Sequence, residues 1–241
     1  MRITRGQRGA SLERVFAPKV GLLGEVGMGN IGNDASMESV LNYLSAAHPD
    51  VTVDAMCMGA ETVRERFGMV AVPMSWSQDK HASGISAIVL KVIGRGLDVF
   101  RIAAWVRRHD VVVIPGMGIF ESSLPVRPWG LPSALFVAGL AGRLFGTKVA
   151  YISVGAGMIN QRITRLLFYW AARLAFYRSY RDVDSREAMR RWGLDTAGDP
   201  VYPDLAFTLP VPPSGPGDPS IVCVGVMDYH GSSDDLSLIH I

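Results

Sequence analysis

The feature that most constrains the fold is a repeated alternation between short apolar runs and longer amphipathic segments. The apolar runs have strand length and no polar alternation, which is typical of strands buried on both faces of a parallel sheet. A segment with helical spacing follows most runs, so helices are expected to cover both faces of the sheet. We expect strands at 20–23, 51–56, 111–114, 149–153, near 180 and at 201–207, and helices at 35–47, 85–106 (one broken helix or two), 133–145, 164–177 and 185–192. The sequence therefore predicts a doubly wound, Rossmann-like α/β domain.

The chain is expected to contain more than this domain. Residues 1–18 form a basic N-terminal extension without the apolar core of a secretory signal, and 19–208 form the Rossmann-like domain. A Pro/Gly/Ser-rich linker is expected at 209–220, before another apolar run at 221–226. A lone apolar strand can neither bury both faces nor pair its backbone groups. We therefore expect 221–241 to be the start of a truncated C-terminal domain, with an added strand on the first sheet as the alternative.

Composition narrows the function classes. Hydrophobic residues make up 49% of the chain, which is enough for a buried core, and the net charge of +2 is too small to predict a nucleic-acid partner. Cys57 and Cys223 are far apart and have no His or Cys at metal-ligand spacing, so a cytoplasmic location without a metal is expected. The most lipid-like stretch, 131–154, is interrupted by Arg143 and Lys148, and is expected to be helix, turn and strand.

The first glycine-rich loop lies after the first expected strand. Gly27, Gly29 and Gly32 satisfy G-x-G-x-x-G, and Asp54 follows at the spacing of a ribose-binding acid, so the first interpretation is a nicotinamide dehydrogenase. Two details weaken this interpretation: residues 24–26 lengthen the turn, and the helix is expected to begin after Gly32 with a cap at 33 or 34. The remaining alternatives are an anion site at a helix N-terminus and a structural tight turn.

Two more glycine loops follow later strands. Pro115-Gly116-Met117-Gly118 follows the apolar run at 111–114, and Ser153-Val154-Gly155 ends the next. Open α/β sheets bind ligands at the carboxyl ends of their strands, so three such loops would line one crevice.

Charged residues accompany the last expected strands. Arg181 and Asp182 close a strand, Ser185 is expected to cap the next helix, and Asp204 follows another short apolar stretch. The alternatives are a surface ion pair for Arg181 and Asp182, and a turn-forming role for Asp204.

Taken together, these segments resemble the polysaccharide pyruvyltransferase family over about 20–207. The resemblance rests on G-x-G-N-x-G-[DN]-[DE]-A, a strand ending in a G-x-G loop, S-x-G, R-D-x-x-S and P-D-x-A-F, at 27–35, 111–118, 153–155, 181–185 and 203–207. The sequence departs from the family pattern at Asn33, where the family often has Asp, and at 115–118, which replaces a three-glycine run.

The resemblance implies a two-domain fold similar to the GT-B glycosyltransferases, with substrates between the domains. It implies transfer of a pyruvyl group from phosphoenolpyruvate to a sugar of a cell-surface polysaccharide or its lipid-linked precursor, without a cofactor. It also allows the enzyme to associate peripherally with the inner face of the membrane. The acid–base His is expected in the second domain, so the chain alone is expected to be inactive; His230 is not assigned that role. The expected substrate-binding residues are Gly29, Asn30, Gly32, Asn33, Asp34, Gly116, Gly118, Ser153, Gly155, Arg181 and Asp182.

Two other functions stay open from the sequence. A GT-B glycosyltransferase that uses a nucleotide sugar would share the fold, and binding of phosphoenolpyruvate or of a nucleotide sugar would separate the two. The third interpretation is a non-catalytic product of truncation.

Overall fold

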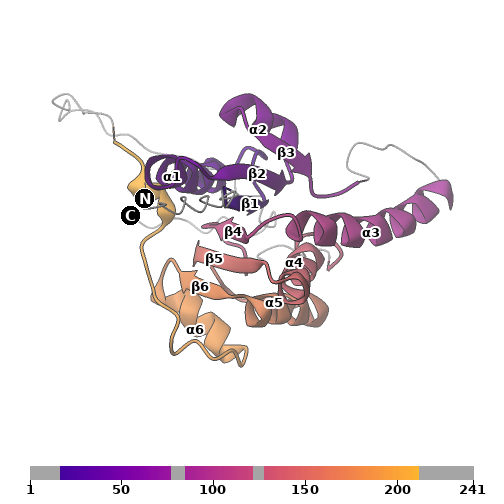
Figure 1. The fold of residues 1–241 in the computed structure, drawn as a ribbon. Helices are drawn as coiled ribbons and strands as arrows, with labels where there is room; N and C mark the ends of the chain where they lie inside the picture. Colours follow the sequence, from indigo (N-terminus) through magenta and orange to yellow (C-terminus); the bar gives the residue numbers. More distant parts are fainter. Residues whose placement is uncertain (1–16, 77–84, 122–127, 212–241) are drawn as a thin grey trace, which may run out of the picture.

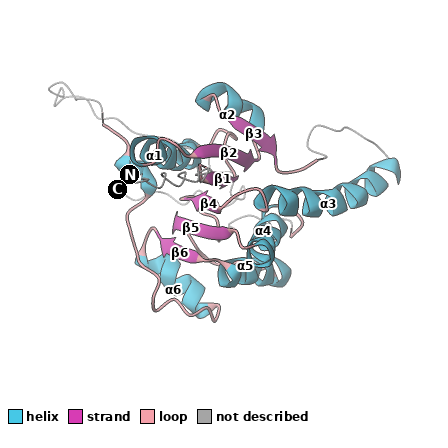
Figure 2. Cartoon of the chain, viewed as in Figure 1, coloured by secondary structure: helices cyan, strands magenta, loops and turns pink. Residues whose placement is uncertain are grey.

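The computed structural model describes residues 17–76, 85–121 and 128–211, and shows a parallel sheet with helices on both faces (Figures 1 and 2). The strand order is β3-β2-β1-β4-β5-β6. The strands are β1 Lys19–Gly24, β2 Thr52–Cys57, β3 Val70–Pro73, β4 Val111–Pro115, β5 Lys148–Val154 and β6 Tyr177–Tyr180. The helices are α1 Ile31–Ala47, α2 Ala60–Phe67, α3 Ile85–Val106, α4 Leu131–Phe145, α5 Arg162–Leu174, α6 Val183–Arg191 and the short 3-10 helix η1 Leu205–Thr208.

The doubly wound α/β class is confirmed, and the differences from expectation are local. The expected strand at 201–207 is wrong: Val201 makes a single bridge to Tyr180, and Pro203 and Asp204 lead into η1 instead. Proline cannot donate to a sheet ladder, which explains why the apolar stretch does not extend a strand. The short pair α2 and β3 was not expected. The linker beyond residue 211, the expected second domain, Cys223, His230 and residues 1–16 lie outside the described residues.

The sheet reverses its direction of winding between β1 and β4. β1 pairs with β2 on one side and with β4 on the other, with Val20 opposite Val111 and Leu22 opposite Val113. The chain therefore winds outward from β1 to β3, crosses back, and winds outward again from β4 to β6. In such sheets the crevice at the reversal, beyond the carboxyl ends of the strands, is the usual ligand site. The loops after β1 and β4 come at this reversal.

The core consists mainly of the strands that the sequence marks as apolar. Four successive residues of β4, from Val112 to Pro115, are buried, as expected for a strand covered on both faces. Phe120, just after β4, contacts the rings of Tyr151 and Phe168 with centroid distances of 4.9 and 5.6 Å. The second glycine loop is therefore held by aromatic packing against β5 and α5.

A polar network ties the end of α3 to the sheet. Trp105 Nε1 donates to Asp54 Oδ1 at 2.7 Å, and His109 Nε2 lies 3.1 Å from Asp54 Oδ2. His109 Nδ1 donates to the Trp105 carbonyl oxygen at 2.8 Å. Gly21 lies opposite Asp54 in the sheet, and any side chain at Gly21 would overlap the Trp105 ring. Asp54 thus lies within β2 and is bound in this network, which contradicts its interpretation as a ribose-binding acid.

We predict that Trp105→Phe lowers the free energy of unfolding by about 1–2 kcal/mol, because the partly exposed Asp54 carboxylate loses a hydrogen bond. Urea denaturation measures this change. The matched control is Trp129→Phe, since the Trp129 side chain is largely exposed and its substitution should alter stability by less than about 0.5 kcal/mol. Equal effects of the two substitutions would contradict a stabilising role for the Trp105–Asp54 bond.

Candidate functional site

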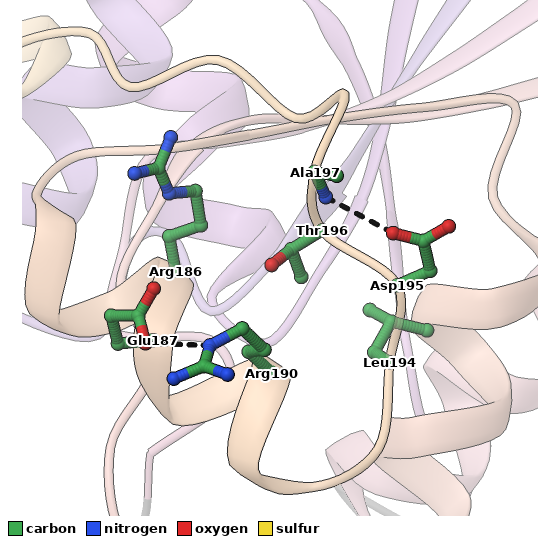
Figure 3. A pocket seen from close by; sticks show the side chains of 7 residues that line it. All are labelled: Arg186, Glu187, Arg190, Leu194, Asp195, Thr196 and Ala197. Atoms are coloured by element: carbon green, nitrogen blue, oxygen red, sulfur yellow. Dashed lines mark hydrogen bonds and ion pairs between the residues drawn. The ribbon is translucent and has the colours of Figure 1, made fainter.

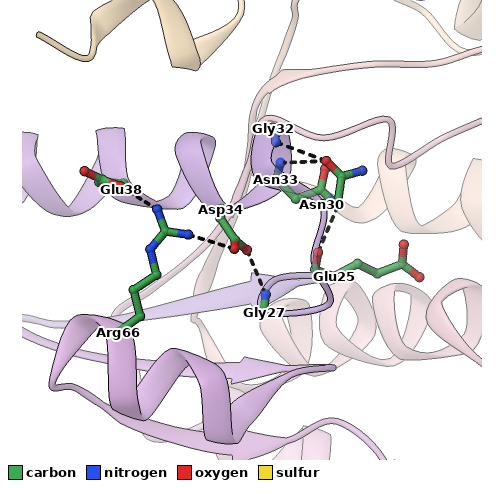
Figure 4. A network of polar contacts seen from close by, with 8 residues as sticks. All are labelled: Glu25, Gly27, Asn30, Gly32, Asn33, Asp34, Glu38 and Arg66. Atoms are coloured by element: carbon green, nitrogen blue, oxygen red, sulfur yellow. Dashed lines mark hydrogen bonds and ion pairs between the residues drawn. The ribbon is translucent and has the colours of Figure 1, made fainter. Parts of the chain in front are cut away.

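The first glycine loop is held by Asp34 of α1 (Figure 4). Gly27 N–H donates to Asp34 Oδ1 at 2.8 Å, and Arg66 of α2 binds Asp34 Oδ2 at 3.0 Å and Glu38 at 3.3 Å. Gly27 has a φ of +77°, and a Cβ on it would overlap the backbone carbonyl of Gly59. Asp34 is 5% exposed, so in this structure its carboxylate holds the loop instead of facing the crevice.

Helix α1 begins earlier than the sequence indicates. The expected cap at Asn33 or Asp34 is wrong, because Asn30 is the N-cap: its Oδ1 accepts from Gly32 N–H at 3.1 Å and from Asn33 N–H at 3.3 Å. Asn33 Nδ2 instead donates to the carbonyl oxygen of Glu25 at 2.9 Å. Asn is among the strongest capping residues, and glycine is tolerated in a first turn, so Gly32 lies inside the helix. Gly29, by contrast, is exposed with a φ of +86° and has open space where a side chain would project.

The second and third glycine loops are hydrogen-bonded to each other. Gly116 N–H donates to the Ile152 carbonyl and Gly155 N–H to the Met117 carbonyl, both at 2.7 Å. Phe120 N–H then donates to the Gly155 carbonyl at 3.0 Å. The N–H groups of Gly116 and Gly155 are therefore occupied within the protein. These two N–H groups are not available to bind a ligand.

The glycines of these two loops make room for charged side chains. The Glu121 carboxylate lies against Gly118, where a Cβ would overlap it, and the Arg181 guanidinium lies over Gly155, 2.7 Å from the position of a Cβ. Gly116 is similarly close to Ser36 of α1, which brings the first helix against the second loop. Ser153 is 1% exposed, and its backbone N–H donates to Ser179 Oγ at 2.9 Å. The Ser153 side chain therefore does not line an open surface.

Arg181 lies among three carboxylates. Its nitrogens are 3.6 Å from Glu121, 3.6 Å from Asp182 and 3.7 Å from Asp204, and about a third of its side chain is exposed. These distances are those of ion pairs without close hydrogen bonds. Arg181, one of the expected substrate-binding residues, thus lies at the strand ends, and it forms with these three carboxylates a cluster of formal charge −2.

The R-D-x-x-S motif has a local structural explanation. The expected cap at Ser185 is wrong: Asp182 is the N-cap of α6, and its Oδ1 accepts from Ser185 N–H at 2.6 Å. Ser185 Oγ instead accepts from Ala156 N–H at 3.0 Å and is buried. Asp is as good a cap as Ser, and it lies at the true start of the helix. Asp182 and Ser185 therefore anchor α6 and the third loop, with Arg181 directly beside them.

The P-D-x-A-F segment returns the chain to the first helix. Asp204 caps η1 by accepting from Ala206 N–H at 3.0 Å, while its other oxygen is the one near Arg181. Ser39 of α1 donates to the Leu205 carbonyl at 2.7 Å. Asp204 therefore fixes a turn, as one alternative proposed, and also contributes charge beside Arg181. In Figure 1 this segment runs from α6 across to α1.

Sequence reasoning assigned no role to two acids at these loops, Glu25 and Glu121. Glu25 follows β1 directly, and burial raises the pKa of its carboxyl group. Glu121 follows the second loop and is 40% exposed beside Arg181. The available signal was position alone: Glu25 directly follows β1 and Glu121 follows the loop after β4, and these two strands flank the reversal of the sheet.

A separate hollow of about 230 Å³ lies between α6 and the segment that follows it (Figure 3). Arg186, Glu187, Arg190 and Asp195 line it, and Arg190 pairs with Glu187 at 2.7 Å. It contains none of the residues expected to bind substrate. The candidate site therefore remains the group of Arg181, Glu121, Asp182 and Asp204 at the strand ends, which we call the strand-end cluster.

The family described as Polysaccharide pyruvyl transferase matches residues 30–239, most of the chain.

The chain belongs to the polysaccharide pyruvyl transferase family.

This is an enzyme family, and its match includes the second and third loops, the R-D-x-x-S motif and the P-D-x-A-F segment. No curated protein sequence matches the chain. Among solved structures, the UDP-GlcNAc 2-epimerase from Methanocaldococcus jannaschii is similar with 9% identity and a TM-score of 0.48, over 76% of this chain and 45% of that one. MnaA of S. aureus with UDP has 10% identity and a TM-score of 0.47, over 77% and 43%. The chain thus spans less than half the length of these structures.

The glycines of the first loop in this family member should differ in their effect on stability. Gly29→Ala should lower the free energy of unfolding by about 1–2 kcal/mol, because a left-handed backbone strains any side chain. Gly27→Ala should cost about 1–3 kcal/mol more, because its Cβ would also overlap a backbone carbonyl that cannot rotate away. Chemical denaturation of both variants measures the difference. A Gly27→Ala protein as stable as Gly29→Ala would contradict the close contact with Gly59.

Proposed function

We propose that this protein transfers a pyruvyl group from phosphoenolpyruvate to a sugar hydroxyl of a polysaccharide or of its lipid-linked precursor. The family match over residues 30–239 carries this proposal. The fold supports it, since the motifs that carry the resemblance at 27–35, 111–118, 153–155 and 181–185 come at the carboxyl ends of β1, β4, β5 and β6. Asp54, which a dehydrogenase would need for ribose, is bound instead by Trp105 and His109.

The charges at the strand ends suit a sugar better than a phosphate. Carboxylates accept hydrogen bonds from sugar hydroxyls, whereas a cluster with a formal charge of −2 repels an anionic donor. We therefore propose that the strand-end cluster binds the acceptor, and that cations from the expected second domain hold the phosphate and carboxylate of phosphoenolpyruvate. Arg181, placed between Glu121 and Asp204, then keeps the acids ionised and oriented. Gly29 and the start of α1 remain open to part of either substrate.

In the transfer, an acid protonates the methylene carbon of phosphoenolpyruvate, and an oxocarbenium-like centre forms at the adjacent carbon. The sugar hydroxyl attacks that centre and loses its proton to a base. A second hydroxyl then closes the ketal, phosphate leaves with the electrons of its C–O bond, and the departing phosphate takes the proton of that hydroxyl. Glu121 is the proposed base, because its carboxylate is partly exposed and ion-paired with Arg181. An ionised carboxylate at the crevice can accept the hydroxyl proton.

The donor can be tested by thermal denaturation of the purified full-length protein. Phosphoenolpyruvate at about one hundred times its dissociation constant should stabilise the folded state by about 2.7 kcal/mol and raise the Tm. NAD should give no shift, and nucleotide sugars are the competing ligands to include. A shift with a nucleotide sugar and none with phosphoenolpyruvate would favour a glycosyltransferase and overturn the proposed donor.

The base can be tested with Glu121→Gln, which keeps the shape of the side chain and removes its basicity. We expect kcat to fall by about 10²–10⁴-fold while the free energy of unfolding changes by less than about 1 kcal/mol. The measurement is release of phosphate with a saturating acceptor, together with a thermal melt. Glu187→Gln is the matched control, since Glu187 pairs with Arg190 on α6, outside the strand-end cluster. Full activity in Glu121→Gln would remove it as the base.

A further inference from the structure

Helix α5 carries apolar residues on two faces. Phe168, Ala171 and Ala172 are buried against the domain, as expected for a helix that covers a sheet. On the opposite face Ile163 and Leu166 are more than half exposed, and Trp170 follows at helical spacing with 41% exposed. A helix that only covers a sheet has no need of this second apolar stripe.

Helix α4 extends this apolar area. It packs directly against α5, so closely that a Cβ on Gly139 would lie 3.2 Å from Leu174 Cβ (Figure 2). Leu140 and Leu144 lie one turn apart on its solvent side, and Leu144 is 71% exposed. Phe176, just beyond α5, is 64% exposed. We call the exposed face of these two helices and Phe176 the α4–α5 surface.

Basic residues are distributed across the same surface. No Asp or Glu occurs between Glu121 and Asp182, in a chain whose net charge is only +2. The exposed cations on this surface are Arg143, Arg162, Arg165 and Arg173, and Lys148 at the start of β5 lies beside it, next to Phe176. Two of them stack on aromatic rings of the surface: Lys148 lies 5.1 Å from the Phe176 centroid, and Arg173 lies 5.7 Å from that of Trp170. Cations and apolar side chains are thus interleaved.

Hollows along α5 bring these cations together. One of about 360 Å³ is lined by Arg162, Arg165, Leu166 and Tyr169. Another of about 450 Å³ lies where Arg143 of α4 meets Arg173 and Trp170 of α5, with Asp195 at its edge. Each hollow therefore combines at least two arginines with apolar side chains, which suits a phosphate headgroup joined to acyl chains.

We propose that the α4–α5 surface binds the face of an anionic lipid bilayer, with Ile163, Leu166 and Trp170 entering the interfacial layer and the arginines contacting headgroups. Exposed aliphatic and aromatic residues flanked by cations are the pattern of interfacial helices. A symmetric contact with a second copy would place these cations against one another, which argues against a dimer through this face. Nucleic acid offers no counterpart for exposed Ile, Leu and Phe side chains.

The placement of α5 relates this surface to the crevice. Helix α5 starts a few residues after the third loop, so Arg162 and Ile163 lie at the same edge of the sheet as the strand-end cluster. A bilayer on the α4–α5 surface would therefore lie beside the crevice. The inference does not rest on the proposed pyruvyl transfer, because binding to vesicles requires neither substrate.

The test is flotation of the purified full-length protein with vesicles of phosphatidylcholine alone, and with vesicles that contain about one third phosphatidylglycerol. We expect binding to the anionic vesicles only, reduced by salt. Each arginine near an anionic surface contributes about fivefold to binding, so Arg162→Gln with Arg165→Gln should weaken it about 25-fold. Ile163→Ser with Leu166→Ser should weaken it by at least about tenfold at unchanged charge.

The matched control is Lys19→Gln with Arg64→Gln, which removes two charges from β1 and α2 and should leave vesicle binding within about twofold of the unchanged protein. Circular dichroism confirms that each variant is folded. Three outcomes would overturn the proposal: no binding of the unchanged protein to anionic vesicles, equal weakening by the control pair, or a serine variant that changes the oligomeric state without changing vesicle binding. A Tm shift with phosphoenolpyruvate is measured without vesicles, so failure of either proposal can be distinguished from failure of the other.

Discussion

The parallel pairing of β4 and β5 continues past the ends of both strands, and the arrangement of the candidate site depends on this extension. Gly155 N–H donates to the Met117 carbonyl and Phe120 N–H to the Gly155 carbonyl, so the two loops form one layer. That layer fixes Glu121 over Gly118 and Arg181 over Gly155. Ser185 strengthens it by accepting from Ala156 N–H, and Asp182 holds the helix on which Ser185 lies. The loops are therefore rigid supports for charged side chains.

The general architecture was predictable because strands that are buried on both faces have continuous apolar sequences, which can be recognised from local composition. Continuous apolar runs indicated the central strands, and glycines after them indicated the edge at which the loops meet. The short elements α2 and β3 were not predictable in this way, since α2 is mostly polar and β3 has only four residues. The apolar stretch at 201–207 was misassigned for the opposite reason: Pro203 prevents a strand there, and packing against α1 through Ser39 places η1 instead.

The roles of individual site residues were harder to predict than their location. A glycine indicates that space is needed, but not what occupies that space. At Gly118 and Gly155 the occupant is a side chain of the protein, not a ligand, and it comes from as far as 26 positions away in the second case. Asp34 is similar, because its partner Arg66 lies on a helix that local patterns did not indicate. Contacts between distant segments decide such roles, and a single sequence does not contain them.

The distribution of charge links the two proposals. A net charge of +2 suggests an unremarkable surface, yet the acids and bases are separated within one domain. Glu121, Asp182 and Asp204 lie around Arg181 at the strand ends, whereas the 60 residues between Glu121 and Asp182 contain no acid at all. An anionic surface attracts the second region and repels the first, over distances of about one Debye length. The domain would therefore approach such a surface with α4 and α5 toward it and with its acidic crevice beside it, open to a sugar that the surface carries.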